Sequence, residues 1–398
     1  MTSLVLLDHA RGMSDADALA PITTARPLAE VRAGARLVRE RWAAALGVKV
    51  SGVIAAMRLT GFEEPGSAPV LSDDCVLDAG TIIASSHFAP SLEPVVRADN
   101  DTWTFAGTVV AAALPARTRV SDIRAAGVTP GRISAPIEGW LLANAWDLIG
   151  HLPAMLAADT LLIARTALPP EAVPDDVRVL GAFPVRIAES AVVEPFVVLD
   201  ATQGAIVIEE FAVVRSFSRL TGPIVIGPHS HWMAGSGHTV AVGDHCKVSG
   251  EVSTSILCGH ANKGHDGFVG HSYLGRWTNL GAGTVTSNLK NTYGSVTFAG
   301  AETRLQFLGS LLGDHAKTGI LTRLTTGSSI GAGANVISDD VVPNVVPSFA
   351  WGSRGDRYER DRFLQTAERV MARRKVALSA SMRACLGAVH DACAATTA

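Results

Sequence analysis

The 398-residue sequence is poor in charged and aromatic side chains, which make up 18% and 6% of the residues. The acids and bases are interspersed, the formal net charge is -3, and no basic block is present that could neutralise the phosphates of DNA or RNA. We therefore expect no nucleic-acid partner. The five cysteines form no Cys-x-x-Cys pair, which favours a reducing cytosol over a secreted disulfide framework.

Long apolar runs are also missing. Only four consecutive apolar residues lie between Ser3 and Asp8, too few for a signal peptide, and no run reaches transmembrane length. These absences predict a cytoplasmic protein without a membrane partner. The 38 glycines and 47% hydrophobic residues instead favour a turn-rich or repeat-built fold, and the length favours two domains.

Residues 1–170 alternate short strand-like and helix-like runs, which predicts an α/β, Rossmann-like domain. We expect a strand at 4–7, a helix at 27–46 that ends at Gly47, a second strand at 48–54 and a closing helix at 140–158. The proline-rich residues 171–185 are interpreted as the linker to the next domain.

Aliphatic residues then recur every six positions over residues 186–352. This interval predicts a left-handed parallel β-helix of hexapeptide repeats, in which each coil has three faces and each face points one aliphatic side chain inward. A chance run of aliphatics in a β-sandwich is the less favoured alternative. Residues 353–398 should be helical and cap the end of this domain. The expected inward positions include Ile187, Val193, Leu199, Leu324, Ile330, Val336 and Val342.

Eight of the twelve histidines fall between His229 and His315, and His265 is the one that we single out. It lies sixteen residues before the glycine-rich turn GAGTVTSN, which spans 281–288. Since one coil contains about eighteen residues, the two segments should be neighbours in space. Imidazole suits proton transfer near neutral pH. We expect the neighbouring His260 and His271 to matter less.

The run from His265 to Asn288 resembles the acetyltransferase domain of the bifunctional glucosamine-1-phosphate acetyltransferase and N-acetylglucosamine-1-phosphate uridyltransferase family. In that family a histidine precedes a GAGT turn and an asparagine at this spacing. The resemblance implies that His265 is the general base, that acetyl-coenzyme A is the co-substrate and that an amino-sugar phosphate, glucosamine 1-phosphate first, is the acceptor. It also implies substrate contacts at Asn288, Asn279 and Glu251, and contacts to coenzyme A at Ala282, Ser310 and Ala332.

Two positions depart from the family pattern. Phe268 replaces a tyrosine three residues after the histidine, and Ser253 replaces a lysine that grips the sugar phosphate. Lys263 and Lys290 flank the site and would supply the missing charge. Because a β-helix prism of this kind generally completes its coenzyme A pocket with a neighbour, we expect a homotrimer.

The whole chain resembles more closely a variant branch of that family described as sugar nucleotidyltransferases, through LAPITTARPLAEVRAG, GDHAKTGI and VPSFAWGS. The opening is similar to a nucleotidyltransferase's phosphate-binding loop, but DHARGMSDADA replaces the glycine-rich turn and Leu28 stands at the lysine position. The phosphates of UTP or another nucleoside triphosphate would then be bound by Arg11, Arg26 and Arg32.

A second departure in this region concerns Mg²⁺. In VLDAGTII, Thr81 stands where the family has a metal-binding aspartate, which leaves Asp78 as the substitute. Phosphoryl chemistry depends on the charge and position of the metal. We therefore expect slow or absent nucleotidyl transfer.

Two other functions stay open. A zinc enzyme resembling γ-class carbonic anhydrases, whose three histidines meet between subunits, would use His238, His260 and His265, because two ligands of that class lie five residues apart. That interpretation leaves the GAGT turn and Asn288 unexplained. A non-catalytic scaffold that binds sugar nucleotides is the third candidate.

Overall fold

The computed structural model describes residues 3–8, 19–95, 101–127, 131, 133–166, 173–352 and 356–395. The chain forms two compact units. The first unit consists of Met1–Val31, Arg36–Ala145 and Leu364–Ala398, and the second consists of Arg32–Ala35 and Trp146–Phe363. Among the described residues, no helix is both long and apolar enough to span a membrane.

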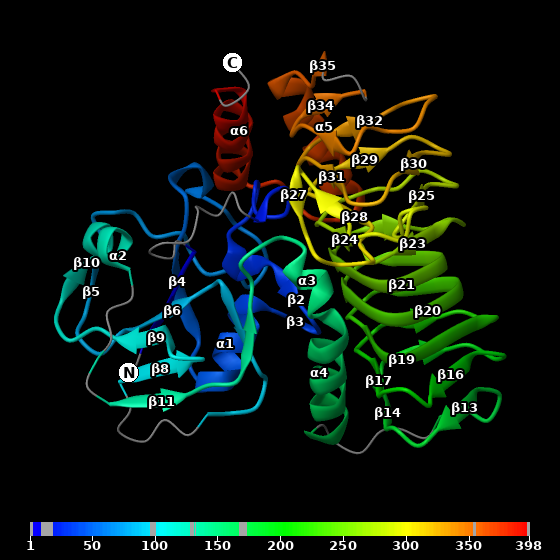
Figure 1. Cartoon of the computed structure of the whole chain (residues 1–398), viewed down its shortest axis with the longest axis horizontal. Coiled ribbons are helices and arrows are strands. Elements are labelled where there is room, and N and C mark those ends of the chain that lie inside the picture. Colours follow the sequence, from blue (N-terminus) through cyan, green and yellow to red (C-terminus); the bar gives the residue numbers. More distant parts are fainter. Residues whose placement is uncertain are drawn as a thin grey trace. The chain divides into compact units, whose positions relative to one another are not determined.

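The first unit is built on a mixed six-stranded sheet in the order β11-β8-β9-β6-β1-β4 (Figure 1). Strand β1 pairs in parallel with β4 and β6, and β9 is antiparallel to both of its neighbours. The predicted α/β character is therefore confirmed. The strands are β1 (Leu4–Leu7), β4 (Val50–Ile54), β6 (Ile82–Ser85), β8 (Thr102–Phe105), β9 (Thr108–Ala113) and β11 (Ser134–Pro136).

Shorter elements complete the first unit. Two antiparallel pairs are β5 (Val76–Leu77) with β10 (Thr118–Arg119), and β7 (Phe88–Pro90) with β12 (Gly139–Leu141). The strand β3 spans Arg36–Leu37 and precedes the first α-helix. The helices are η2 (Leu28–Glu30), α1 (Val38–Leu46), η3 (Met57–Leu59), α2 (Val120–Ala126) and α6 (Ala380–Ala395).

The prediction of a helix at 27–46 is correct only for its second half, where α1 (Val38–Leu46) forms. Gly34 has a φ of 63°, a left-handed conformation that stops a right-handed helix, and the chain is extended in β2 (Arg32–Ala33) just before it. The predicted end is confirmed, since Gly47 also has a φ of 63° and follows the last residue of α1.

The second unit is a parallel β-helix, as predicted (Figure 1). It begins at Arg178, so part of the stretch assigned to a linker is already its first coil. The long strands β19 (Ser218–Ile226), β20 (His231–Asp244) and β21 (Lys247–Gly259) run around corners and contribute to more than one face.

Three faces result from the pairing of successive coils. The first face consists of β13 (Arg178–Gly181), β16 (Val198–Ala201), parts of β19, β20 and β21, β23 (Phe268–Gly270), β25 (Val285–Thr286) and β30 (Arg323–Leu324). The second consists of β14 (Val185–Ile187), β17 (Ile206–Ile208), the last parts of β19, β20 and β21, β24 (Tyr273–Leu274), β28 (Ser310–Leu312), β31 (Ser328–Ile330) and β33 (Val345–Val346). The third consists of β15 (Val192–Val193), β18 (Val213–Val214), the first parts of β20 and β21, β22 (Asn262–Lys263), β29 (Lys317–Thr318), β32 (Asn335–Val336) and β34 (Ala350–Trp351), with β35 (Asp356–Arg357) antiparallel to β34.

The interior of the β-helix is a continuous aliphatic core. All seven inward positions predicted from the six-residue period belong to it and are at most 8% exposed. One coil is interrupted after β25 by an insertion that carries the hairpin β26 (Thr297–Phe298) and β27 (Ala301–Glu302). The core continues without a break, because β24 pairs directly with β28 beyond the insertion.

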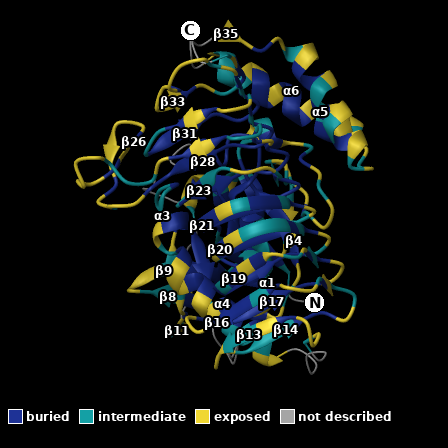
Figure 2. Cartoon of the chain, turned by 90° about the vertical axis from the view of Figure 1, so that its right-hand side faces the viewer, coloured by how far each residue is buried: buried dark blue, intermediate teal, exposed yellow. Residues whose placement is uncertain are grey.

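Helix α4 (Leu152–Thr166) follows α3 (Asp147–Gly150) and packs on β17, β19, β20 and β21. The outward side chains of the second face are apolar and buried here, among them Val207, Val225 and Ile256. The segment expected at 140–158 to close the amino-terminal domain therefore belongs mainly to the β-helix unit. At the far end, Phe363 of α5 (Arg360–Arg373) packs edge-on against Phe349, and α5 carries both buried and exposed positions (Figure 2).

The corner between the second and third faces carries a stack of rings, which we call the ring stack. It consists of Phe211, His229, His245, His260, Trp277 and His315. The first five are spaced by 4.0 to 4.8 Å between consecutive ring centroids. Every member has a φ between 49° and 62°, so stacking offsets a left-handed backbone that is unfavourable for residues other than glycine. Four of the eight clustered histidines are therefore structural residues of this corner.

Gly237 provides a test of how tightly the interior is packed. A Cβ atom added at this glycine would lie 2.4 Å from Cη2 of the buried Trp232. We expect Gly237→Ala to lower the free energy of unfolding by about 1–3 kcal/mol, measured by chemical denaturation. The exposed neighbour provides the control, since Ser236→Ala should change stability by less than about 0.5 kcal/mol.

Measuring Gly237→Ala in a Trp232→Phe variant shows whether the loss of stability comes from a clash with the Trp232 ring. The smaller ring leaves room for the added methyl group, so Gly237→Ala should cost less there. An equal loss in both backgrounds would show that the Trp232 ring is not the obstacle.

Candidate functional site

His265 is exposed in the turn 264–267, which joins the third face to the first. This turn packs directly on the GAGT turn of the next coil. Gly283 N donates a hydrogen bond to Asp266 O at 3.2 Å, and a Cβ atom added at Gly267 would lie 2.2 Å from Thr284 O. The proximity predicted from the spacing of one coil is confirmed.

Lys263 holds this turn from inside. Its side chain is 2% exposed, and its ammonium group donates to Ser249 O at 2.9 Å and to His265 O. Burial lowers the pKa of Lys263 to about 8, although Asp266 opposes the shift. The expectation that Lys263 offers charge to a phosphate is therefore wrong for this conformation, because the ammonium group is directed at backbone carbonyls.

The outer side of the first face carries further predicted residues. Glu251 and Phe268 are partners in the register of β21 and β23, and Glu251 is exposed. Ser253 pairs with Gly270 in the same register and with His238 on the other side. Glu251 therefore lies one strand away from Phe268, the residue that follows the His265 turn.

Asn288 lies at the opposite end of the first face, where the insertion begins. Its Nδ2 atom is 2.8 Å from Nδ1 of His271. Gly270 makes room for this amide, because a Cβ atom there would lie 2.8 Å from Asn288 Nδ2 and 2.3 Å from Phe268 Cζ. His271, which we expected from the sequence to matter less than His265, is thus the histidine in contact with Asn288, and the interval of seventeen residues between them is again close to one coil.

The other predicted residues lie elsewhere on the second unit. Asn279 is on the third face, where its Oδ1 accepts a hydrogen bond from Asn262 Nδ2 at 2.7 Å. Ala282 lies beside the His265 turn, and its carbonyl accepts from Leu321 N at 2.7 Å. Ser310 and Ala332 are at most 1% exposed. Lys290 lies in the insertion, with Nζ 3.5 Å from Thr297 Oγ1.

The three histidines of the zinc alternative, which would meet between subunits, lie apart from one another within the described part of one chain. His238 points outward from the first face, His265 lies in its turn, and His260 is buried in the ring stack. Among the described residues, the one group with metal-binding proximity is Asp244, His245 and His260.

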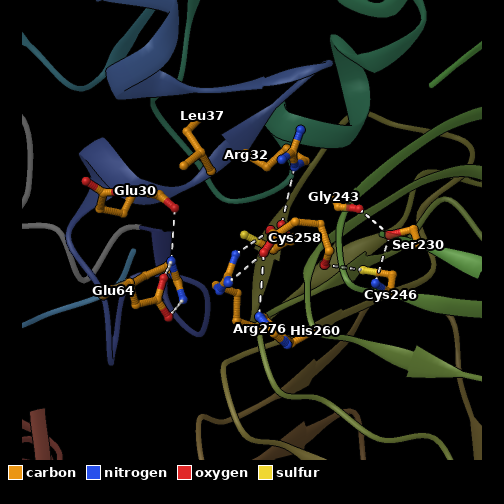
Figure 3. Close-up of polar contacts among 12 residues, drawn as sticks. Glu30, Arg32, Leu37, Glu64, Ser230, Gly243, Cys246, Cys258, His260 and Arg276 are labelled. Carbon is orange, nitrogen blue, oxygen red and sulfur yellow. Dashed lines mark hydrogen bonds and ion pairs between the residues drawn. The ribbon is translucent and has the colours of Figure 1, made fainter. Parts of the chain in front are cut away.

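That group already has a cation. Arg276, labelled in Figure 3, donates to both carboxylate oxygens of Asp244, at 2.7 and 3.0 Å. Burial alone would raise the pKa of Asp244, but the Arg276 guanidinium outweighs burial and holds that pKa well below its usual range. A metal ion would have to displace the guanidinium, so these residues do not fit a zinc site.

In the first unit, ligands of an α/β sheet are expected at the carboxyl ends of the parallel strands. That edge carries Asp8 after β1, and Ser86 and His87 after β6. Thr81 and Asp78 precede β6 and lie at the opposite edge, where Asp78 is 88% exposed and 3.6 Å from Arg117. The assignment of Thr81 to the metal-binding position and of Asp78 as its substitute is therefore wrong, because both lie at the amino end of the strand.

The groups at the carboxyl edge interact with the protein itself. Asp8 is 2% exposed and accepts hydrogen bonds from Leu28 N at 2.7 Å and Ala29 N at 3.2 Å. His87 places Nδ1 3.0 Å from Leu142 O and Nε2 3.0 Å from Asp8 O. Both imidazole nitrogens therefore face backbone carbonyls, and each carboxyl oxygen of Asp8 already accepts a backbone hydrogen bond. Groups that are already bonded to the backbone do not fit Mg²⁺, so we derive no step through this metal.

The arginines proposed for the phosphates are buried as well. Arg26 is 1% exposed and donates to Glu30 O at 3.0 Å and to Glu64, the two acceptors labelled in Figure 3. Arg32 is 7% exposed and donates to Cys258 O at 3.3 Å. Neither side chain is directed at solvent, which corrects both predictions. Arg11 lies outside the described residues.

Comparisons with known proteins give one family match and several relatives. Residues 12–167 match the family described as "Sugar nucleotidyl transferase". A bifunctional protein GlmU of Bartonella quintana (strain Toulouse) is 29% identical over 206 residues, which cover 49% of this chain and 40% of the relative. That of Jannaschia sp. (strain CCS1) is 29% identical over 218 residues, which cover 53% and 40%. The chain thus spans less than half the length of these curated relatives.

The pKa of Lys263 predicts a pH-dependent contribution to stability. The pKa of Lys263 is about 8 in the folded chain and ordinarily 10.5. Between these pH values the unfolded chain keeps a proton on Lys263 that the folded chain has released. The free energy of unfolding of the wild type relative to Lys263→Met should therefore be constant below pH 8 and increase as the pH rises through this window. Chemical denaturation across the pH range measures the difference.

Lys317 provides an internal check. Its pKa is also lowered to about 8 by burial, and it is present in both proteins, so its contribution cancels. A difference that decreases with rising pH would contradict the assigned burial of the Lys263 ammonium group.

The carboxyl edge of the first unit predicts weak handling of Mg²⁺. Millimolar Mg²⁺ should leave the melting temperature unchanged compared with NaCl of equal ionic strength, because a ligand stabilises only a protein that binds it. Pyrophosphate release from UTP and a sugar 1-phosphate should be slow or absent. Saturable stabilisation by Mg²⁺, or its brisk support of pyrophosphate release, would show that Asp8 and His87 leave room for the metal after all.

Proposed function

We propose that this chain, GlmU-like in its family, transfers an acetyl group from acetyl-coenzyme A to the amine of an amino-sugar phosphate. Glucosamine 1-phosphate is the first acceptor to test. The observation that carries the proposal is the direct packing of the His265 turn on the GAGT turn of the next coil. This packing supports the functional spacing implied by the family resemblance.

In the proposed reaction, the acceptor nitrogen attacks the thioester carbon. The carbon–sulfur bond breaks, coenzyme A leaves as a thiolate that is then protonated, and the nitrogen loses a proton. His265 is the proposed general base for this proton, because its imidazole is exposed and its backbone is fixed by Lys263. The turn is thereby held rigid while the ring stays accessible to the acceptor.

Glu251 and Asn288 are the proposed acceptor contacts. Glu251 is exposed on the strand beside Phe268, and the Asn288 amide and the Phe268 ring both lie close to Gly270. Asn279 and Ala282 remain proposed contacts to the acceptor and to coenzyme A. With Lys263 directed inward, Lys290 is the remaining proposed partner of the acceptor phosphate.

The site is incomplete within one chain in this proposal. His265 precedes the first face and Asn288 follows it, so a neighbouring β-helix would supply the opposite wall of the pocket. We therefore propose a homotrimer of cytoplasmic subunits. For the first unit we propose that it binds a sugar nucleotide or its phosphate and does not catalyse metal-dependent nucleotidyl transfer. The non-catalytic scaffold considered above would then describe this unit alone.

Replacement of His265 tests the proposal. A positioned general base contributes about 10²- to 10⁴-fold, so His265→Ala should lower kcat for acetyl transfer by that factor and leave the KM for acetyl-coenzyme A nearly unchanged. Release of coenzyme A from acetyl-coenzyme A and glucosamine 1-phosphate measures the rate.

His229→Ala is the control, because His229 is an exposed histidine of the same β-helix that lies in the ring stack, away from the His265 turn. It should keep wild-type turnover. The assignment of His265 fails if both variants retain full activity, and an inactive wild type with a panel of amino-sugar phosphates would refute the proposed function.

A further inference from the structure

The amide of Asn288 is fixed by a residue outside the predicted site. Asn288 Nδ2 lies 2.8 Å from His271 Nδ1, and the two residues come from successive coils. The backbone of Asn288 is also held, since its carbonyl accepts from Leu308 N at 2.9 Å. The Nδ2 atom of the Asn288 amide is therefore hydrogen-bonded to His271. Its Oδ1 atom accepts no hydrogen bond from the described part of the chain.

His271 is itself held on several sides. Its backbone N–H donates to Ser253 O at 2.9 Å, and its carbonyl accepts from Gly309 N at 2.8 Å. The ring of Phe307 lies nearly parallel to the imidazole, with 5.2 Å between centroids and 24° between planes. Because β21 and the end of the insertion both contact His271, its ring is a rigid support for the amide.

The contact of Asn288 Nδ2 with His271 Nδ1 sets which way the amide faces, provided that the ring nitrogen can accept a hydrogen bond. Burial, and then repulsion from His238, lower the pKa of His271 to about 4. The ring is therefore neutral at neutral pH, with one donor and one acceptor nitrogen. Since the amide nitrogen of Asn288 can only donate, His271 Nδ1 accepts and the ring proton is on Nε2. This leaves Asn288 Oδ1 as the end of the amide available to another group.

We propose that His271 is a positioning residue that orients Asn288 so that Oδ1 accepts a hydrogen bond from the N–H of the acceptor amine. This rests on the proposed acetyl transfer. An acceptor oxygen at that place aligns the N–H and leaves the nitrogen lone pair free for the thioester carbon. A flipped amide would present its NH₂ group, which would compete for the same lone pair.

A double-mutant cycle tests whether His271 acts through Asn288. We expect His271→Ala to lower kcat/KM for the amino-sugar phosphate by about 10- to 100-fold and to leave the KM for acetyl-coenzyme A unchanged. Asn288→Ala should lose at least as much. The double variant should have the same kcat/KM as Asn288→Ala alone, because His271 has no amide left to orient once Asn288 has been replaced. Losses that multiply would overturn the inference.

Two conservative variants separate the hydrogen bond from the shape of the side chain. His271→Asn places an oxygen near the position of Nδ1 and tolerates the left-handed φ of 49°, so it should restore most of the activity. His271→Gln places its polar atoms near the position of Nε2 and should stay as low as His271→Ala. Equal rescue by both variants, or by neither, would contradict a specific acceptor at Nδ1. His229→Ala is again the control with unchanged activity.

Nitrogen NMR of the ¹⁵N-histidine-labelled full chain gives a readout that does not need turnover. His271 should show a neutral ring with the proton on Nε2, and Asn288→Ala should shift its Nδ1 resonance while leaving that of His229 in place. A proton on Nδ1 at neutral pH would overturn the inference even in an active enzyme. The predicted tautomer in a protein without acetyl transfer would support the contact and refute the proposed function instead.

Discussion

The inward stacking of aliphatic side chains from successive coils is the constraint on which the rest of the β-helix depends. Leu257, Leu274, Leu312 and Ile330 follow one another along the second face because each coil must return to the same axis. Positions one coil apart consequently lie side by side on the outer surface as well. The contact of Asp266 with Gly283 and that of His271 with Asn288 both follow from this core.

The insertion between β25 and β28 shows how the same constraint tolerates additional chain. Leu274 pairs with Leu312 as if the intervening residues were absent, so the insertion leaves and re-enters at a corner. Its two ends are tied together by the bridge between Leu289 and Phe307. The insertion thereby adds Asn288 and Phe307 to the surface beside His271 without disturbing the core.

Polar residues in the two units differ in what they contact. At the carboxyl edge of the first unit, Asp8 is buried and each of its carboxyl oxygens accepts a hydrogen bond from a backbone N–H, while His87 faces backbone carbonyls. In the β-helix, Glu251 on the first face and His265 in the turn that precedes this face are exposed. This difference is the physical reason for placing the proposed chemistry on the β-helix.

The sequence alone determined the β-helix, its inward positions and the pairing of the His265 turn with the GAGT turn, because a six-residue period and a fixed coil length are properties of the chain itself. It did not determine the direction of side chains. Lys263 turns inward to carbonyl groups, and Thr81 lies at the amino end of its strand.

The different roles of the eight clustered histidines were likewise decided by tertiary structure. His260 is stacked in a corner, His271 supports Asn288 and His265 is exposed, although all three are the same residue within twelve positions. Corner geometry and contacts between coils select among them, and these come from residues far from each histidine in the sequence. The sequence shows that these residues carry an imidazole ring. Only the packing of neighbouring coils decides whether a given ring is exposed, stacked in a corner or hydrogen-bonded to Asn288.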